Sequence, residues 1–441
     1  MLLLPQKTDF IFENLNKSGF ECYAVGGCVR DLLMGNTPQD YDFTTDATPQ
    51  EIIKCFDGYK VFDTGIKYGT ISVVCDGECY EITTFRVDGK YSDSRHPDEV
   101  LFSKSIVDDL SRRDFTINSI AFNSNSGIVD PFGGIDDIKK KIIRATGNPY
   151  DRMREDALRI LRGLRFSSRL GFSIDNLTLD AMYENKEQLS LVHPFRIRNE
   201  LEGLLKSDNA SEVLYTHREI IKEVIPEISP MFDFVQNNPH HKFDVWRHTV
   251  EVVKNTPPDL TLRISALFHD IGKPFSVTTD KKGINHFKGH QYVSYRMTVE
   301  ILERFGFSRS IINDVGKLVL NHDERFKNIN IDIKRVLKDI DAELFEKLLI
   351  LSKADMLSQS DYKRQEKLSH HKAVEEEYNK IIRNGECYKI SQLKINGDDL
   401  KALGFEGRVI GDTLSYCLDT VIAGEVENNS KALIDFIKRD I

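Results

Sequence analysis

The spacing of hydrophobic and polar residues changes partway along the chain. Between residues 21 and 143, short runs of β-branched and aromatic residues alternate with Gly and Asp turns, which is typical of short strands. These runs lie at residues 23–25, 70–74 and 80–85. After Asn148-Pro149 the apolar residues recur at helical spacing, so helices are expected to dominate from there to the C-terminus. The helical positions include Met153, Ala157, Leu161 and Leu164.

This pattern predicts an α+β fold class, with a small α+β head followed by mostly α-helical segments. The 441 residues exceed what one hydrophobic core normally organises, so several domains are expected. The predicted divisions are residues 1–143, 144–228, 229–360 and 361–441. No apolar run is long enough for a secretory signal or a membrane span, and the predicted location is the cytoplasm.

Charge and cysteine content narrow the class further. The net charge of -9 argues against a surface that binds nucleic acid throughout, yet residues 139–206 hold 14 Lys and Arg against 9 Asp and Glu. A polyanion is therefore expected to dock on that region only. The seven cysteines form no CxxC pair, which favours reduced thiols over disulfides or structural zinc.

The most informative motif is Gly26-Gly27 with Arg30, followed by Asp40 and Asp42. A glycine pair lets backbone N–H groups approach phosphate oxygens, and arginine adds a fixed cationic fork. Aspartates at i and i+2 project from one face of a strand and can bridge two Mg²⁺ ions. The sequence therefore predicts a site for a nucleoside triphosphate and divalent metal, with Asp40 and Asp42 as catalytic metal ligands. Taken alone, the glycine pair would be an ordinary turn, and the two aspartates would be a solvated strand end or an Asx turn.

Other residues of the head are candidates for the same site. Glu81 lies on a later predicted strand, where it is either a third metal-binding carboxylate or an exposed strand residue. Arg112 and Arg113 can contact triphosphate oxygens, while Asp114 and Asn118 can select a ribose hydroxyl. Alone, this group would be a solvated charge cluster. Residues 86–97 are polar and too long for a tight hairpin, which predicts a mobile loop beside the site.

The segment from Arg154 to Arg162 allows two interpretations. On one helix, Glu155 and Asp156 would lie at i,i+4 and i,i+3 spacing from Arg159 and form ordinary stabilising ion pairs. Alternatively, Asp156 accepts from and Arg159 donates to the Watson–Crick edge of a base. Cytosine and adenine both place an amino donor beside a ring acceptor, so an Asp-Arg pair suits C and A but not G or U.

A second group of residues has metal-ligand chemistry. His248, His269-Asp270 and Asp355 stand on separate predicted helices, with His290 and His322 between them. A single His-Asp pair is more often a capped helix end, but several candidate ligands separated by apolar helical patterns favour one metal centre. Such a centre can generate hydroxide for phosphoester hydrolysis.

At these motifs the first half of the chain resembles class II tRNA nucleotidyltransferases, the CCA-adding enzymes, which share their head with bacterial poly(A) polymerases. The resemblance rests on Gly26-Gly27 with Arg30-Asp31, Asp40-Tyr41-Asp42, Arg95-His96-Pro97, Arg112-Arg113-Asp114 with Asn118, Asp130-Pro131-Phe132-Gly133-Gly134, and Glu155-Asp156 with Arg159. It implies metal-dependent transfer of CMP and AMP from CTP and ATP to a tRNA 3′ end without a nucleic-acid template. By the same resemblance Asp40 and Asp42 hold two Mg²⁺ ions, while residues 112–118 serve triphosphate and ribose.

The resemblance also assigns the base-reading role to Asp156 and Arg159, with Arg162 and Glu155 beside them, and links the loop that contains Arg95 with A addition. It implies a polymerase-β-like nucleotidyltransferase head (1–143), a helical neck with the base-reading motif (144–228), an HD domain (229–360) and a helical tRNA-binding body and tail (361–441).

The later histidines resemble the HD phosphohydrolase superfamily. That resemblance implies His248, His269, Asp270 and Asp355 as the core ligands of a divalent transition metal or Mg²⁺, with His290 and His322 as additional ones. Phosphohydrolase activity is a secondary hypothesis, because several members keep the fold without activity. The alternatives for the whole chain are an A-only-adding enzyme, a poly(A) polymerase, or an HD phosphohydrolase with a nucleotide-binding head.

Overall fold

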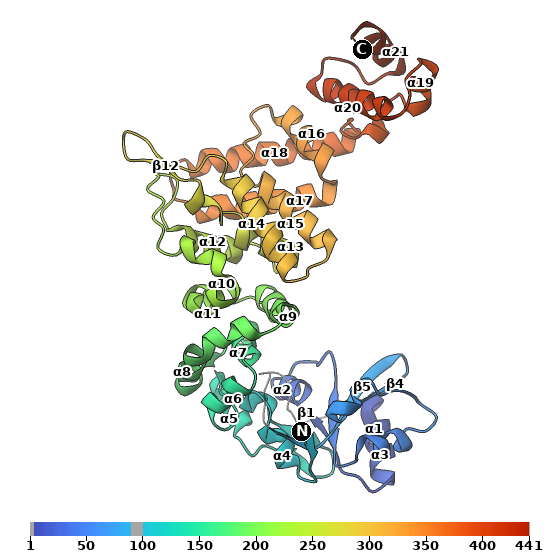
Figure 1. Ribbon diagram of the computed structural model, residues 1–441, viewed down its shortest axis with the longest axis vertical. Helices are drawn as coiled ribbons and strands as arrows, with labels where there is room; N and C mark the ends of the chain where they lie inside the picture. The colour runs from blue at the N-terminus through green and yellow to red at the C-terminus, as the bar shows by residue number, and fades with distance from the viewer. Residues whose placement is uncertain (1–3, 90–99, 441) are drawn as a thin grey trace. The chain divides into compact units, whose positions relative to one another are not determined.

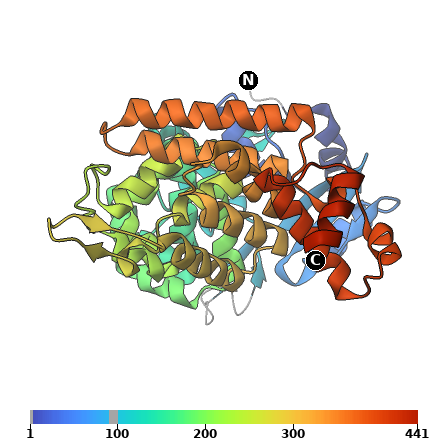
Figure 2. The same ribbon diagram turned by 90° about the horizontal axis from the view of Figure 1, so that it is seen from above.

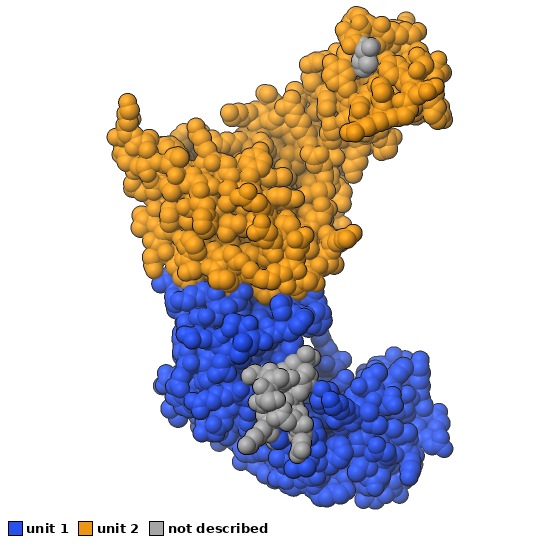
Figure 3. All heavy atoms as spheres, viewed as in Figure 1, with its two compact units in different colours: residues 1–224 blue, residues 225–441 orange. Residues whose placement is uncertain are grey.

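The computed structural model describes residues 4–89 and 100–440. The chain divides into two compact units, residues 1–224 and residues 225–441, which Figure 3 shows in different colours. Among the described helices, none combines the length and the apolar character that a membrane crossing requires. The cytoplasmic location stays a prediction.

The first unit is built on a mixed sheet that, within the described residues, has seven strands in the order β3-β4-β5-β2-β1-β8-β9. Their bounds are β1 (Cys22–Val25), β2 (Asp42–Thr45), β3 (Lys60–Phe62), β4 (Thr70–Cys75), β5 (Glu78–Thr84), β8 (Ala121–Asn123) and β9 (Gly127–Val129). Strands β2 and β5 are parallel, whereas the other neighbours are antiparallel. A separate hairpin pairs β6 (Arg86–Asp88) with β7 (Val100–Phe102).

The sheet separates two apolar cores. On one face, Phe43, Ile71 and Ile82 pack with Phe12 of α1 (Asp9–Lys17) and Ile52 of α3 (Pro49–Cys55). The other core includes Tyr23, Val25, Phe85 and Ala121 with Leu110 of α4 (Ile106–Ser111). Helices α2 (Gly27–Leu33) and α5 (Gly134–Lys140) complete the head. The predicted strands at 23–25, 70–74 and 80–85 are confirmed as β1, β4 and β5.

The remainder of the first unit is helical, as the change of pattern after Pro149 predicts (Figure 1). Its helices are α6 (Pro149–Glu155), α7 (Leu158–Leu170), α8 (Asn176–Asn185), α9 (Pro194–Leu205), α10 (Ala210–Thr216) and α11 (Arg218–Val224). Helix α7 packs against α9, and α6 packs against α8. The short strands β10 (Ile142–Ile143) and β11 (Ser173–Ile174) pair in parallel beside them.

The second unit is almost entirely helical. Its larger part holds α12 (Val245–Asn255), α13 (Leu260–Phe268), α14 (His290–Arg304), α15 (Arg309–Asn321), α16 (Ile329–Asp339), α17 (Ala342–Ser358) and α18 (Arg364–Asn384), with a small hairpin of β12 (Thr278–Thr279) and β13 (Asn285–His286). Helix α17 packs against α12, α13 and α15, and the long helix α18 lies alongside α17 (Figure 2).

A smaller cluster of helices forms the C-terminal end of the second unit. Helices α19 (Gly397–Ala402), α20 (Arg408–Ala423) and α21 (Ser430–Asp440) share a core around Leu400, Cys417 and Leu433. The division into two units falls close to the predicted boundary between residues 228 and 229. All boundaries of the predicted four-part division stay predictions.

Candidate functional sites

The glycine pair forms the turn between β1 and α2. Gly26 has a φ of 80°, a conformation that favours glycine, and an added Cβ would lie 3.2 Å from Nη1 of Arg113. Its carbonyl accepts a hydrogen bond from the Arg30 N–H at 3.1 Å, so the turn leads directly into α2. A side chain at position 26 would therefore strain the backbone and push against Arg113.

Two of the predicted carboxylates stand on neighbouring strands. Asp42 begins β2 and is paired in parallel register with Glu81 on β5, so their side chains project to the same face of the sheet. The strand interpretation of Asp40 is wrong in detail, because Asp40 precedes the first residue of β2. Asp40, Asp42 and Glu81 are all exposed to solvent. The sheet thus presents a row of acids at one edge of the site.

The electrostatics of Asp42 reflect this crowding. Partial desolvation of Asp42 by the surrounding head, together with the charges of Asp40 and Glu81, raises its pKa to about 6, and Arg113 opposes the rise. A carboxylate that is costly to ionise alone gains most from a bound cation. The residues present therefore fit a divalent metal site of oxygen ligands.

The two arginines after α4 are held by an aspartate that sequence reasoning did not single out. Nε and Nη2 of Arg112 donate to Oδ1 of Asp109 at 3.0 and 2.7 Å, and Nη2 of Arg113 donates to Oδ2 at 3.1 Å. Asp109 is fully buried, and the arginines lower its pKa against the effect of burial. The spacing of Asp109 at i−3 and i−4 from two arginines was the available signal.

Arg30, Asn118, Asp114 and Arg162 form one buried network rather than four separate contacts. Nη1 of Arg30 donates to Oδ1 of Asn118 at 2.7 Å, and Nδ2 of Asn118 donates to Oδ1 of Asp114 at 3.1 Å. Nη2 of Arg162 lies 2.6 Å from Oδ2 of Asp114, whose pKa is lowered to about 2 even though the residue is buried. Arg30 is only 3% exposed, so its fork faces protein. The predicted triphosphate and ribose contacts of these residues stay predictions.

The segment from Arg154 to Arg162 differs from the expected single helix. Helix α6 ends at Glu155, α7 begins at Leu158, and Asp156 between them has extended backbone with φ of −146° and ψ of 101°. Its Oδ1 accepts the Leu158 N–H at 3.0 Å, which caps the new helix.

The break also changes the partners of the base-reading candidates. The predicted i,i+4 pair is present, because Nη1 of Arg159 donates to Oε2 of Glu155 at 2.7 Å. The i,i+3 pair between Asp156 and Arg159 is not formed, so that part of the interpretation is wrong. Asp156 instead accepts from Nη1 and Nη2 of Arg196 on α9, at 3.2 and 2.6 Å. Nη2 of Arg159 donates to the Arg112 carbonyl at 3.1 Å, which joins the neck helix to the arginine pair of the head. Arg95 lies outside the described residues.

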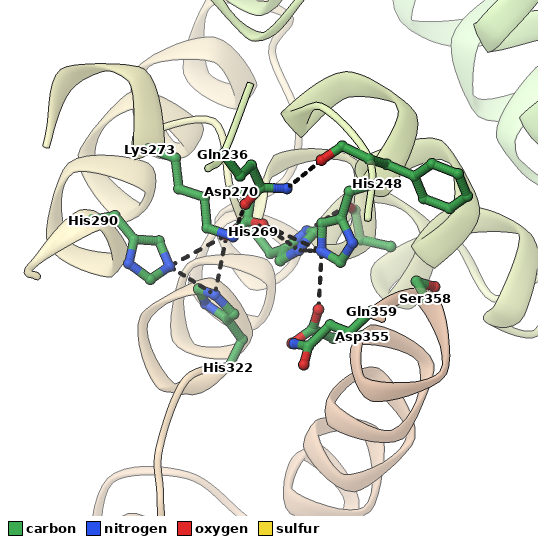
Figure 4. Close-up of polar contacts among 12 residues, drawn as sticks. Gln236, His248, His269, Asp270, Lys273, His290, His322, Asp355, Ser358 and Gln359 are labelled. Atoms are coloured by element: carbon green, nitrogen blue, oxygen red, sulfur yellow. Dashed lines mark hydrogen bonds and ion pairs between the residues drawn. The ribbon is translucent and has the colours of Figure 1, made fainter. Parts of the chain in front are cut away.

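In the second unit, the predicted histidines and aspartates converge from separate helices (Figure 4). Asp244 caps the start of α12 and Asp259 that of α13, which positions His248 on the first helix and His269-Asp270 at the end of the second. His290 begins α14 and His322 follows the end of α15. Two groups have ligand atoms within 4.8 Å of one another: His248, His269 and Asp270; and Asp270, His290 and His322. Asp270 is shared by both.

The orientation of the imidazoles fits metal ions. Nδ1 of His269, His290 and His322 lies 2.8, 2.7 and 2.7 Å from the carbonyls of Ala266, Phe287 and Val319. A carbonyl can only accept, so each Nδ1 carries a proton and Nε2 is the nitrogen left to bind a second proton or a metal ion. Nε2 of His290 and of His322 are only 3.1 Å apart, and those of His269 and His248 are 3.4 Å apart. Two facing lone pairs repel unless a proton or a cation lies between them.

Asp355 adds a second carboxylate from α17. Its Oδ1 lies 3.0 Å from Nε2 of His248, and its Oδ2 accepts from Nε2 of Gln359 at 3.0 Å. The interaction with His248 lowers the pKa of Asp355 well below its usual range, and Asp270 and Asp355 together raise the pKa of His248 to about 9. A cavity of about 860 Å³ within the second unit is lined by Asp270, His290, His322 and Asp355. His241 and Lys273, which the sequence did not single out, also line it.

Comparisons with known proteins agree with this architecture. Residues 22–144 match the poly A polymerase head domain, residues 171–232 a probable RNA and SrmB-binding site of polymerase A, and residues 240–346 the HD domain. The chain is 41% identical to the CCA-adding enzyme of Oceanobacillus iheyensis over 60% of this chain. That match spans 62% of the relative's length.

Two further comparisons extend over the whole chain. The CCA-adding enzyme of Leuconostoc mesenteroides is 32% identical over 97% of this chain and 94% of its own length. The structure of the Bacillus stearothermophilus CCA-adding enzyme in complex with CTP superposes with a TM-score of 0.68 at 25% identity, covering 99% of this chain and 98% of that one. Because these matches cover nearly the whole of this chain and of each relative, the chain belongs to the family of CCA-adding enzymes.

Proposed function

We propose that this protein adds CMP, CMP and AMP to the 3′ end of tRNA, taking them from CTP and ATP without a nucleic-acid template. The observation that carries the proposal is the parallel register of Asp42 with Glu81 beside Asp40, facing the cation of Arg113. Relatives support the substrates, since solved CCA-adding enzymes include complexes with CTP, with ATP and, from Thermotoga maritima, with tRNA.

The head residues divide the work of transfer between them. Asp40 and Asp42, with Glu81 as a third candidate, would hold two Mg²⁺ ions. When bound, the ions supply a polarised 3′-hydroxyl nucleophile and neutralise the triphosphate. Arg113, held by Asp109 against the glycine turn, places a fixed positive charge beside the carboxylates. Preorganised charge of this kind stabilises the transition state without a reorganisation cost.

Selection of the base is assigned to the break between α6 and α7. The extended backbone at Asp156 turns its carboxylate out of the helix ladder, where an incoming amino group can compete with Arg196 for it. Arg159, the second residue of α7, is anchored on Glu155 and on the Arg112 carbonyl of the head. An Asp-Arg pair then accepts C and A and leaves G and U mispaired.

The decisive experiment supplies purified protein with tRNA that lacks its terminal CCA, together with CTP, ATP or both. Incorporation of two C residues followed by one A supports the proposal. Failure to incorporate C would instead favour A-only addition or polyadenylation. If neither C nor A is incorporated, the remaining interpretation is an HD phosphohydrolase with a nucleotide-binding head.

A second activity is proposed for the HD centre, because the facing Nε2 lone pairs and the shared Asp270 favour bound divalent cations. His248, His269, Asp270 and Asp355 would hold the core ion, with His290 and His322 completing a second position. Bound ions supply a water-derived nucleophile for phosphoester hydrolysis. The test measures hydrolysis of p-nitrophenyl phosphate with Mn²⁺ or Mg²⁺; loss of activity in His269→Ala supports it, and no hydrolysis by the metal-loaded wild type contradicts it.

A further inference from the structure

The cavity beside the HD centre has a set of cations that the proposed metal chemistry leaves unused. Its lining includes four basic side chains away from the histidines, which we call the cationic rim: Lys288, Arg325, Lys327 and Lys367. Two acids of the same lining, Asp323 and Glu324, are fewer than these cations. Lys288, Arg325 and Lys327 are exposed, and none of them forms an ion pair with any other described residue. The rim is therefore available to an anion from solvent.

Lys367 joins this rim to the proposed metal centre. Its Nζ donates to Oε1 of Gln359 at 2.5 Å, and Nε2 of Gln359 donates to Oδ2 of Asp355 at 3.0 Å (Figure 4). An ammonium can only donate and a carboxylate can only accept, so the amide between them has one orientation. The Lys367 ammonium is thus separated from a candidate metal ligand by the width of a single amide group.

Arg325 lies on the same side of the cavity as Lys367, although the two come from different elements. Desolvation lowers the pKa of His240, and the charges of Lys367, Lys363 and Arg325 lower it further. Nε2 of His370, one turn along α18 from Lys367, lies 3.0 Å from the Arg325 carbonyl. This contact ties the segment between α15 and α16 to α18, so the cations of the two elements face one region.

The backbone of that segment is held in an uncommon conformation. Phe326 has a φ of 45°, which bulky side chains rarely adopt, and it is buried with its ring edge-on to Phe345 at 6.0 Å between centroids. The residues on either side, Arg325 and Lys327, are both exposed. A buried anchor between two exposed cations fixes where the cations emerge, and backbone strain of this kind is found most often at functional sites.

We propose that Arg325, Lys327 and Lys367 form an anion subsite, which binds a second phosphate of a substrate whose first phosphate lies at the HD centre. The ligand class is a phosphate ester that carries a further phosphate group. Arginine and lysine donate charge-assisted hydrogen bonds to phosphate oxygens, and a cavity of about 860 Å³ has room for an organic molecule that reaches both positions. This inference rests on the proposed metal-dependent HD activity.

The experiment measures binding by calorimetry to full-length protein with saturating Mn²⁺. The probes are a series of alkane bisphosphonates of increasing chain length, each paired with the monophosphonate of the same length, because neither has an ester bond to hydrolyse. An Asp42→Asn background removes the proposed metal site of the head from the measurement. We expect at least one bisphosphonate to bind about 10-fold more tightly than its monophosphonate, the value of one charge-assisted contact.

The double variant Arg325→Gln/Lys327→Gln should lose this gain and keep the affinities for the monophosphonate and for Mn²⁺. Lys281→Gln, at the exposed turn between β12 and β13, is the control and should keep the gain. Equal losses for both kinds of probe in the double variant would indicate a general electrostatic effect and overturn the subsite.

Two further outcomes separate the subsite from the activity on which it rests. If wild type hydrolyses p-nitrophenyl phosphate with Mn²⁺ but binds no bisphosphonate more tightly than its monophosphonate, the subsite alone is overturned. If wild type neither binds Mn²⁺ in the second unit nor hydrolyses p-nitrophenyl phosphate, the HD activity is overturned and the subsite with it.

Discussion

At the scale of single residues, the pattern of residue types predicted which side chains gather but not what each one touches. Asp42 lies beside Glu81 in the head, and the histidines of the HD centre lie together in the second unit, as expected. Carboxylate and imidazole groups are common metal ligands, so the residue types alone indicated these positions. Lys273 escaped prediction because a buried lysine has the same sequence signature as a surface one. Its contact with Asp270 is created only by the fold.

The raised pKa of Asp42 predicts a pH-dependent stability of the metal-free head. A carboxyl group whose folded pKa is about 6 instead of 3.8 favours the folded state while it is protonated. That contribution is present below about pH 4 and is lost as the pH rises to about 6. Asp42→Asn should therefore unfold at a higher temperature than wild type at pH 7.5 without Mg²⁺, and abolish nucleotide transfer. Thermal unfolding with and without Mg²⁺ checks this.

The Asp42 prediction has a direct counter-result. If Mg²⁺ stabilises Asp42→Asn as much as it stabilises wild type, the ion is not bound at Asp42. Glu21→Gln serves as a matched control, because this carboxylate is also exposed in the head and stands outside the site.

The pKa of Asp114 is shifted in the opposite direction to that of Asp42. Arg162 and Asn118 hold its pKa at about 2 in the folded state, so its contribution is present above about pH 4 and is lost as the pH falls toward 2. Asp114→Asn should cost about 2 to 3 kcal/mol in the free energy of unfolding at pH 7, from a difference of about two pKa units. Urea denaturation at pH 7 and pH 3 measures it; a cost that is equal at both values would argue against the ion pair as its source.

At the scale of elements, the strands and helices were predictable where the pattern is local. Strands β1, β4 and β5 follow β-branched and aromatic runs, and the helices after Pro149 follow the helical spacing of apolar residues. The break between α6 and α7 was not predictable, because the helical spacing of apolar residues continues through it from Met153 to Leu164. Arg196, which holds the Asp156 carboxylate at the break, lies on α9. The sequence immediately around the break therefore does not contain the partner of Asp156.

The break predicts a specificity role for α9. Arg196→Met leaves Asp156 without its partner, so the carboxylate loses its fixed direction. We expect a several-fold rise in UTP and GTP incorporation relative to CTP and ATP, smaller than the rise in Asp156→Ala, where the acceptor itself is gone. Incorporation assays with each nucleotide measure it. An unchanged preference in Asp156→Ala would return the residue to a purely structural role as a helix cap.

At the scale of the whole molecule, each compact unit carries its own core and its own cluster of chemical groups. The carboxylates of the head lie in residues 1–224, and the histidines in residues 225–441. Several arginines of residues 139–206 are held in ion pairs with carboxylates, namely Arg144, Arg162, Arg165 and Arg196. The proposed docking of tRNA would therefore rely on fewer unpaired cations than the count of basic residues suggests.

The separation of the two clusters predicts independent responses to metal loss. His269→Ala should remove Mn²⁺ binding by the second unit and lower the temperature of one unfolding transition, while CTP and ATP incorporation stays within about twofold of wild type. Calorimetry and the incorporation assay on the same preparation test this. A parallel loss of incorporation would show that the second unit supports transfer. Lys281→Ala, at the exposed turn between β12 and β13, is the control.

The backbone carbonyls that anchor His269, His290 and His322 have one more consequence. Each ring is tied to the end of its own helix, so the opening between the rings has a set width before any ion arrives. In the proposed metal site, this spacing would favour small ions such as Mn²⁺ over Ca²⁺, which is larger and prefers oxygen ligands.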